Sequence, residues 1–241
     1  MNYLHKISPK SALLKAFAFE KSFFRCYLNE VLQSFVRKDQ RFTMNIISGF
    51  ARNLTLADLP DSEIRPTSGR ARKALFDSLG DFRDKKVLDL CSGSGALALE
   101  AVSRGAQWAV MIEKSPAHTA CIQENCRRLR NVMPPEYAAG DLTVVQSDIL
   151  DVRSWIIRLQ SPPDLIFSDP PYPVSAELFR KLLSDKKFCS GCAGAKLIWE
   201  IPDSRGAMGE FINNPALEQM QFRRFGSTIF LLAVITLHND L

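Results

Sequence analysis

The pattern of hydrophobic and polar positions changes at Met44. Before it, between Ser11 and Val36, apolar side chains recur close to the spacing of one helix face. The same stretch is basic, since residues 1–43 carry eight Lys and Arg against three Asp and Glu. We expect residues 1–43 to be a basic amphipathic N-terminal extension, either an organellar transit segment or a stretch upstream of a natural start at Met44. Residues 44–241 have the length of one domain.

From Lys86 onward, short apolar runs alternate with stretches of helical periodicity. The runs that predict strands are Lys86–Leu90, Trp108–Ile112, Leu142–Gln146, Leu165–Ser168 and Lys196–Ile201. The stretches that predict helices are Ala96–Arg104, Ser115–Leu129, Leu150–Gln160 and Ala176–Ser184. This order is typical of βαβ crossovers, which build a parallel sheet buried on both faces.

The two ends of the predicted domain have a different pattern. Met44–Gly49 and Leu54–Leu56 predict an N-terminal β-hairpin, and Ser68–Leu79 predicts a helix after it. Gln219–Arg224 and Thr228–Thr236 are separated by a short Gly-containing turn, which predicts an antiparallel C-terminal hairpin. We therefore expect a Rossmann-like α/β fold with a mostly parallel seven-stranded sheet. Such a sheet binds its ligand at the carboxyl ends of the strands, near the switch in strand order.

Composition and charge mainly exclude other classes of protein and of site. The chain is 46% hydrophobic and 24% charged, which is typical of globular proteins, and no apolar run is long enough to span a membrane. The net charge of +5 lies entirely in residues 1–43, so it is a weak argument for a nucleic-acid partner of the domain. Cys189-Ser-Gly-Cys192 has the spacing of two zinc ligands. Because no second pair of Cys or His accompanies it, we expect no metal site.

A Gly-x-Gly turn follows the first predicted strand. Gly93 and Gly95 lie between that strand and a helix, where the absence of a Cβ lets the backbone approach a ligand. The spacing to Glu113 also fits a dinucleotide fingerprint, so NAD is an alternative. Asp89 disfavours it, because a carboxylate beside the turn would repel a pyrophosphate.

The same carboxylate suits S-adenosylmethionine, which carries an ammonium group and a sulfonium centre. On this interpretation Asp89, Gly93 and Gly95 line the cofactor site. Glu113 would accept hydrogen bonds from the ribose hydroxyls, and Asp148, after the third strand, would accept one from the adenine amino group.

Asp169-Pro170-Pro171-Tyr172 follows the fourth predicted strand and is the candidate catalytic loop. An exocyclic amine of a nucleobase is a poor nucleophile, because its lone pair is delocalised into the ring. Asp169 and the rigid carbonyl of Pro170 can accept its two N–H bonds and direct the lone pair at a methyl group. Tyr172 offers a ring on which an extruded base can stack.

These motifs resemble those of class I S-adenosylmethionine-dependent amino methyltransferases that carry a (D/N)PP(Y/F) sequence. Within that group the chain is most similar to the ribosomal RNA small subunit methyltransferase D family, from about Met44 to Thr236. The segments that carry the likeness are Asn45–Gly49, Arg65–Phe76, Cys91–Glu100 and Ser103–Ala106. The resemblance implies methylation of the N2 amine of a guanine in 16S rRNA, with the site residues named above. It also implies that Arg65–Thr67 closes over cofactor and substrate.

The expected substrate contacts are basic or polar residues before and within the first helix of the domain: Arg65, Thr67, Arg70, Arg72 and Lys73. A solvated helix face is the alternative for the basic ones. The expected partner is 16S rRNA, within the small ribosomal subunit or an assembly intermediate, and the expected enzyme is a cytoplasmic monomer. An amino methyltransferase acting on N6-adenine in DNA or on a protein glutamine remains an alternative, as does a non-catalytic binding protein of the same fold.

Overall fold

The structure is a computed structural model that describes residues 44–60, 69–137, 141–203, 206–212 and 214–237. The predicted N-terminal extension and the segment that contains Arg65 and Thr67 lie outside these residues. The strands are β1 (Lys86–Leu90), β2 (Trp108–Glu113), β3 (Asp141–Gln146), β4 (Leu165–Ser168), β5 (Lys196–Ile201), β6 (Leu217–Phe225) and β7 (Thr228–Ile235). The helices are α2 (Gly69–Leu79), α3 (Ala96–Ser103), α4 (Pro116–Asn131), α5 (Val152–Ile156), α6 (Tyr172–Leu183) and α7 (Lys186–Gly191), with short 3-10 helices at Pro135–Tyr137 and Ala207–Phe211.

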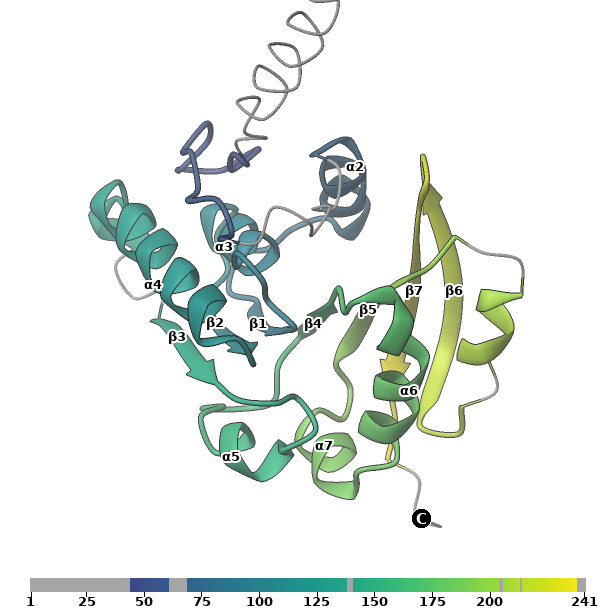
Figure 1. Cartoon of the computed structure of the whole chain (residues 1–241). Coiled ribbons are helices and arrows are strands. Elements are labelled where there is room, and N and C mark those ends of the chain that lie inside the picture. Colours follow the sequence, from purple (N-terminus) through teal and green to yellow (C-terminus); the bar gives the residue numbers. More distant parts are fainter. Residues whose placement is uncertain (1–43, 61–68, 138–140, 204–205, 213, 238–241) are drawn as a thin grey trace, which may run out of the picture. The chain divides into compact units, whose positions relative to one another are not determined.

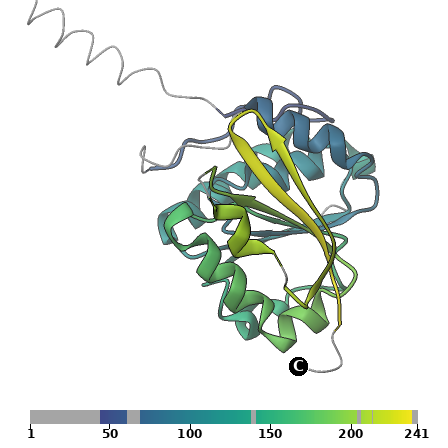
Figure 2. The ribbon, with the colours of Figure 1, turned by 90° about the vertical axis from the view of Figure 1, so that its right-hand side faces the viewer.

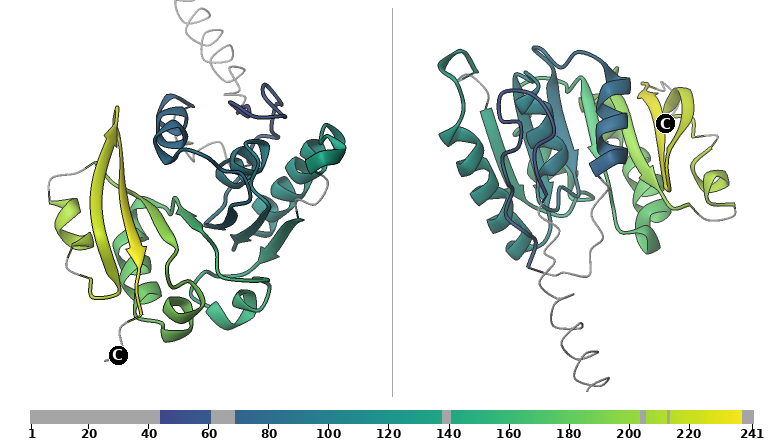
Figure 3. Two further views of the ribbon diagram at one scale, coloured as in Figure 1. Left: turned by 180° about the vertical axis from the view of Figure 1, so that it is seen from behind. Right: turned by 90° about the horizontal axis from the view of Figure 1, so that it is seen from above.

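All seven strands form one sheet in the order β3-β2-β1-β4-β5-β7-β6, which runs from left to right in Figure 1. Strands β1 to β5 are parallel to one another, and β7 is antiparallel to both β5 and β6. The view from behind in Figure 3 shows the β6–β7 hairpin closing one edge of the sheet. The predicted Rossmann-like fold is thus confirmed.

Helices cover both faces of this sheet, as the turned view in Figure 2 shows. One core cluster contains alternate residues of the central strands, such as Val87 and Phe167, with apolar side chains of α2, α3 and α4. The other contains Leu88 and Ile166 with side chains of α5, α6 and α7. Because successive strand residues point to opposite faces, each central strand contributes to both clusters and is mostly apolar, with Asp89 on β1 and Glu200 on β5 as buried acids.

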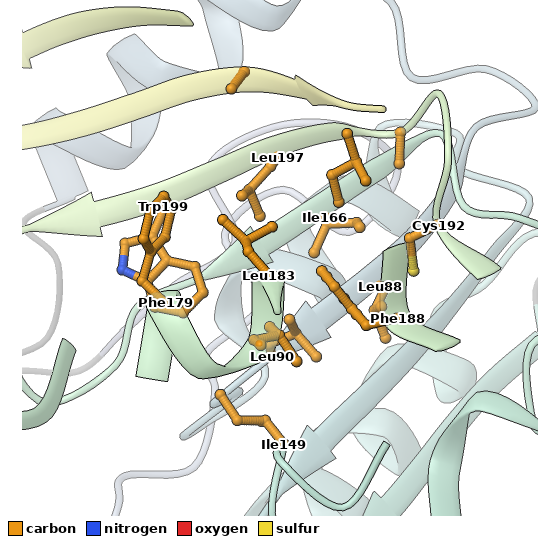
Figure 4. Close-up of a cluster of buried hydrophobic side chains, with 14 of the residues drawn as sticks. Leu88, Leu90, Ile149, Ile166, Phe179, Leu183, Phe188, Cys192, Leu197 and Trp199 are labelled. Atoms are coloured by element: carbon orange, nitrogen blue, oxygen red, sulfur yellow. The ribbon is translucent and has the colours of Figure 1, made fainter. Parts of the chain in front are cut away.

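The second of these clusters also explains the cysteine pair. Cys189 and Cys192 are buried in it, and Figure 4 shows Cys192 among apolar side chains that include Phe188 and Leu88. Burial raises the pKa of the Cys192 thiol to about 12. Among the described residues there is no group of three or more His, Cys, Asp or Glu that could hold a metal ion. Within that part of the chain, too, no helix is both long and apolar enough to cross a membrane.

The predicted N-terminal β-hairpin is present only as one antiparallel bridge, between Asn45 and Thr55. Around this bridge the Ile46 N–H bonds to the carbonyl of Leu54 at 2.9 Å and the Leu56 N–H to the carbonyl of Met44 at 2.8 Å, and further backbone groups bond to α3. The Glu100 carboxylate, which is fully buried, accepts the N–H groups of Ile47 at 2.6 Å and Ser48 at 3.1 Å. Because these donors are satisfied by a helix rather than by a neighbouring strand, no ladder extends from the bridge.

Ser103, also on α3, holds the next turn of the same segment. Its hydroxyl donates to the carbonyl of Ser48 at 2.6 Å and accepts the N–H of Ala51 at 3.0 Å, and its carbonyl accepts the N–H of Phe50 at 2.9 Å. Gly49 lies between these contacts with a φ of 84°. All eight residues of α3 are buried, because the sheet covers one side of the helix and this segment covers the other.

Two helices differ from their predicted bounds by several residues, and a third was not predicted. Helix α6 begins at Tyr172, since Pro173 is well suited to the first turn. Helix α5 ends at Ile156, before the prolines at 162 and 163. Helix α7 was not predicted. The Asp185 side chain caps it by accepting N–H bonds from residues 187 and 188, and its six residues are too few to show periodicity.

Candidate active site

The central strands bring four predicted acids to one edge of the sheet. Asp89 lies on β1, Glu113 ends β2, Asp148 follows β3 and Asp169 follows β4. The strand order reverses between β1 and β4, which are hydrogen-bonded neighbours, and this switch point is where open α/β sheets bind ligands.

The four acids lie close enough to Cys91, just after β1, to shift the pKa of its thiol. Burial raises the pKa of its thiol, and the carboxylates of Glu113, Asp89, Asp169 and Asp148 raise it further, in that order. All four acids therefore act on one atom. The sequence predicted that they would converge, and the structure places them together.

Asp89 is the most buried of the four, with 2% of its surface exposed. Its Oδ2 atom accepts the N–H of Ala98 in α3 at 3.3 Å. Burial raises the pKa of this carboxyl well above its usual range, Asp169 and Glu113 raise it further, and the bond from Ala98 opposes them. A buried carboxylate under these conditions is stabilised by a cation, so the position suits a ligand that carries an ammonium group.

The loop after β1 turns sharply through three residues with positive φ: Cys91 at 58°, Gly93 at 56° and Gly95 at 76°. A Cβ on Gly95 would lie 3.2 Å from Cγ2 of Ile122 and 3.3 Å from the sulfur of Met111, so this position is closed to a side chain. A Cβ on Gly93 would have only Leu59 within 4 Å, at 3.8 Å. The loop thus presents open backbone at Gly93, as the sequence predicted for a ligand cradle.

Glu113 holds that loop through hydrogen bonds from backbone N–H groups. Its Oε2 accepts the N–H of Gly93 at 2.9 Å and its Oε1 accepts the N–H of Ser115 at 2.8 Å, while Nδ1 of His118 lies 3.8 Å from Oε1. Each carboxylate oxygen can accept a second hydrogen bond, so Glu113 can hold the loop and still bind hydroxyl groups.

Asp148 is more exposed than Asp89 and Glu113. Its Oδ2 pairs with the Lys114 ammonium at 2.8 Å, and its Oδ1 accepts the N–H of Leu150 at 3.0 Å. The bond from Lys114, followed by the one from Leu150, lowers the pKa of the Asp148 carboxyl. Asp148 is therefore an ionised acceptor at the outer side of the site.

The candidate catalytic loop leaves β4 at Ser168, which pairs with Leu90 of β1 on one side and with Trp199 of β5 on the other. Pro170 is buried, Asp169 is half-buried, and Tyr172, the first residue of α6, is 47% exposed. A fixed carbonyl, a carboxylate and an accessible aromatic ring thus lie at the switch point.

Glu200 is a site residue that the sequence analysis missed. It lies on β5, is 4% exposed, and accepts a hydrogen bond from the Tyr172 hydroxyl, whose oxygen lies 2.9 Å from Oε1. A signal was available, because Glu200 is the one acid in the otherwise apolar run from Leu197 to Ile201. An acid in a strand buried on both faces requires a polar partner.

Of the three described basic residues on α2 that were predicted to contact substrate, two are exposed and one is buried. Arg70 is exposed, and so is Lys73, which pairs with Asp77. Arg72 is 3% exposed and donates from Nη2 to the carbonyl of Asn45. Burial lowers the pKa of the Arg72 guanidinium, and the nearby Glu100 carboxylate opposes this shift. The prediction of Arg72 as a phosphate contact is therefore wrong, because its side chain lies inside the protein and holds the N-terminal segment.

Comparisons with known proteins agree with this fold. The family model described as Conserved hypothetical protein 95 matches residues 44–233. Ribosomal RNA small subunit methyltransferase D of Escherichia coli strain K12 is 36% identical over 131 residues, which is 54% of this chain and 60% of that protein. The protein of the same name from Buchnera aphidicola subsp. Acyrthosiphon pisum is 30% identical over 143 residues, which is 58% of this chain and 67% of that protein.

Solved structures with the same fold include the yhhF protein of Escherichia coli, which is 27% identical with a TM-score of 0.61 over 80% of this chain and 98% of that one. A hypothetical protein of Thermus thermophilus is 28% identical with a TM-score of 0.58 over 80% of this chain and 99% of that one. The sheet, the loop motifs and the family match over residues 44–233 lead to one conclusion: the chain belongs to the Conserved hypothetical protein 95 family, the group of ribosomal RNA small subunit methyltransferase D.

Proposed function

We propose that this protein is an S-adenosylmethionine-dependent methyltransferase that methylates the exocyclic N2 amine of a guanine in 16S rRNA. The observation that carries the proposal is the position of Asp169-Pro170-Pro171-Tyr172 at the end of β4, directly beside the strand that carries Asp89. An acid suited to a cationic cofactor and a loop suited to an aromatic amine thus lie on adjacent strands.

S-adenosylmethionine supplies an electrophilic methyl group on a sulfonium cation. In the proposal the Asp89 carboxylate pairs with the ammonium group of this molecule, and the backbone at Gly93 and Gly95 lies against it. Glu113 accepts hydrogen bonds from the ribose hydroxyls, and Asp148 accepts one from the adenine amino group. These residues fix the direction of the methyl group, and orientation of this kind accounts for a large share of catalysis in bimolecular transfers.

On the substrate side, Tyr172 stacks on the target guanine. Asp169 and the Pro170 carbonyl accept the two N–H bonds of the N2 amine, which localises its lone pair and points it at the methyl carbon. When bound, S-adenosylmethionine would supply the methyl group, with the new N–C bond forming as the S–C bond breaks and a neutral thioether left behind. The amine is cationic at that point, and Asp169 stabilises the charge and accepts the proton before releasing it to water.

The names of the relatives support an rRNA substrate, and 16S rRNA in the small ribosomal subunit or an assembly intermediate is the proposed partner. Exposed Arg70 and Lys73 on α2 are the described candidates for phosphate contacts. A cytoplasmic monomer is the form we propose.

The test supplies labelled S-adenosylmethionine with under-methylated small subunits, naked 16S rRNA, DNA and a glutamine-containing protein substrate, and then maps the modified group. We expect label at one guanine N2 of 16S rRNA. Label only in DNA or only in protein would reject the rRNA assignment.

Asp169→Ala tests the mechanism in the same assay. Turnover should fall about 100-fold or more, because the orienting acceptor is lost, while the Kd for S-adenosylmethionine stays within about threefold. Asp151→Ala, at an exposed residue that precedes α5, is the matched control. Equal loss of turnover and cofactor binding in Asp169→Ala would assign Asp169 to the cofactor site instead.

A further inference from the structure

Two neighbouring residues of β5 hold the first turn of α6 from opposite faces of the sheet. The Trp199 indole N–H donates to the Ser175 hydroxyl at 2.9 Å, and both side chains are fully buried. Glu200, the next residue, accepts the Tyr172 hydroxyl at 2.9 Å. Trp199 belongs to the core cluster under α6 and lies 5.3 Å from Phe179 between ring centroids, so it keeps the helix on that face.

Glu200 points to the other face. Successive strand residues alternate, so Glu200 shares the face of Ile198, which belongs to the core cluster under α2 and α3. Asp89 lies on this face as well, since it accepts an N–H bond from Ala98 in α3. The bond to Glu200 therefore draws the Tyr172 side chain across the end of the sheet, to the face that carries the cofactor acid Asp89.

We propose that Glu200 is a positioning residue that fixes the ring of Tyr172 in the orientation in which the target base stacks. The proposal rests on the proposed function, since it assigns Tyr172 to the base. Glu200 itself touches neither base nor cofactor, and acts through the Tyr172 hydroxyl.

Burial and charge both favour this role. A carboxylate that is 4% exposed is unfavourable unless it is hydrogen-bonded, and an O–H bond to a carboxylate is stronger than one between neutral groups. Tyr172 is 47% exposed, so about half of its surface is not held by packing. Loss of the bond to Glu200 widens the range of rotamers open to the ring, and stacking of a base then has to order more of them.

The test compares variants that remove the bond from either end. Tyr172→Phe keeps the ring and loses the donor, and Glu200→Leu keeps the volume and loses the acceptor. We expect each to lower kcat/KM for the rRNA substrate about five- to tenfold, mainly through KM, with the Kd for S-adenosylmethionine unchanged. The double variant should be no worse than either single variant, because both remove the same interaction.

Glu200→Gln provides a partial rescue, since its amide oxygen still accepts the hydroxyl, and it should lose less than Glu200→Leu. Tyr137→Phe is the matched control, because Tyr137 is 37% exposed and lies 4.9 Å from the Phe50 ring, away from the site. Wild-type kcat/KM in Tyr172→Phe, or full additivity in the double variant, would overturn the proposal. If Glu200→Leu fails to fold, the result of Tyr172→Phe alone decides the test.

A measurement that needs no activity separates this inference from the proposed function. With 3-fluorotyrosine incorporated, the ¹⁹F resonance of residue 172 is identified by its absence in Tyr172→Phe. It should move toward the position of free fluorotyrosine in Glu200→Leu, and less so in Glu200→Gln. An unchanged resonance in Glu200→Leu refutes the positioning role, whereas absence of rRNA methylation by the wild type refutes the proposed function.

Discussion

Gly49→Ala tests whether the segment before α2 is an integral part of the domain. Gly49 has a φ of 84°, and a Cβ placed on it would lie 1.7 Å from the carbonyl oxygen and 2.2 Å from the carbonyl carbon of Ser103. Both atoms are backbone, so no rotamer change relieves the overlap. The segment must move away from α3, and the contacts around Gly49 must break.

The magnitude follows from those contacts. Three hydrogen bonds join residues 48, 50 and 51 to Ser103, and at about 1 kcal/mol each their loss costs about 3 kcal/mol. The left-handed conformation adds about 1–2 kcal/mol for any residue with a Cβ. Gly194→Ala isolates this second contribution, because Gly194 has a φ of 82° and an added Cβ would meet nothing within 4 Å.

Urea unfolding of the wild type and the two variants measures the difference. We expect Gly194→Ala to lower the free energy of unfolding by about 1–2 kcal/mol, and Gly49→Ala to lower it by about 3 kcal/mol more. Equal destabilisation of the two variants would mean that the segment is not held against α3 as described.

Four further predictions concern charged residues. Asp89→Asn should weaken S-adenosylmethionine binding about 10- to 100-fold by calorimetry, because the acceptor for the ammonium group loses its charge. The pKa of Asp89 is raised in the folded state, so the native protein binds this proton more tightly than the unfolded chain does. The stability of the wild type should therefore fall relative to that of Asp89→Asn as the pH rises from the ordinary Asp value of 3.8 through the raised pKa. A difference in Tm that stays constant with pH would contradict this. Arg72→Met should lower the free energy of unfolding by about 2–4 kcal/mol and Arg70→Met by less than about 0.5 kcal/mol, since only Arg72 is buried; equal values would contradict its burial. Arg70→Met and Lys73→Met should each lower the slope of log K against log salt for rRNA binding by about 1, and an unchanged slope would remove that residue from the phosphate contacts.

The parallel sheet could be predicted almost to the residue, and the reason is burial. β1, β4 and β5 have the predicted bounds, because strands covered on both faces are rich in apolar residues and stand out as short apolar runs. The convergence of Asp89, Glu113, Asp148 and Asp169 followed from the same topology, since parallel strands bring their carboxyl ends to one edge.

What the sequence did not reveal depends on contacts between distant residues. The N-terminal hairpin was predicted from local alternation, but its donors bond to Glu100, more than fifty residues away. Arg72 was grouped with Arg70 by charge, although it precedes Phe76 by one helical turn and so shares its buried side. Glu200 had a visible signal, yet its partner Tyr172 became evident only when α6 was seen to begin at that residue.

The neighbouring positions of β1 and β4 in the sheet have a consequence for biosynthesis. Asp164 lies 78 residues after Lys86 in the chain, yet its carboxylate accepts the Lys86 N–H at 2.8 Å at the start of the two strands. Asp89, Gly93 and Gly95 are therefore translated well before Asp169 and Tyr172, and the hydrogen bond to Tyr172 forms only after Glu200 has been translated. Long-range strand pairing of this kind is slow compared with helix formation. The nascent chain should thus acquire its capacity to bind a base last, after the cofactor loop and α3 have already formed.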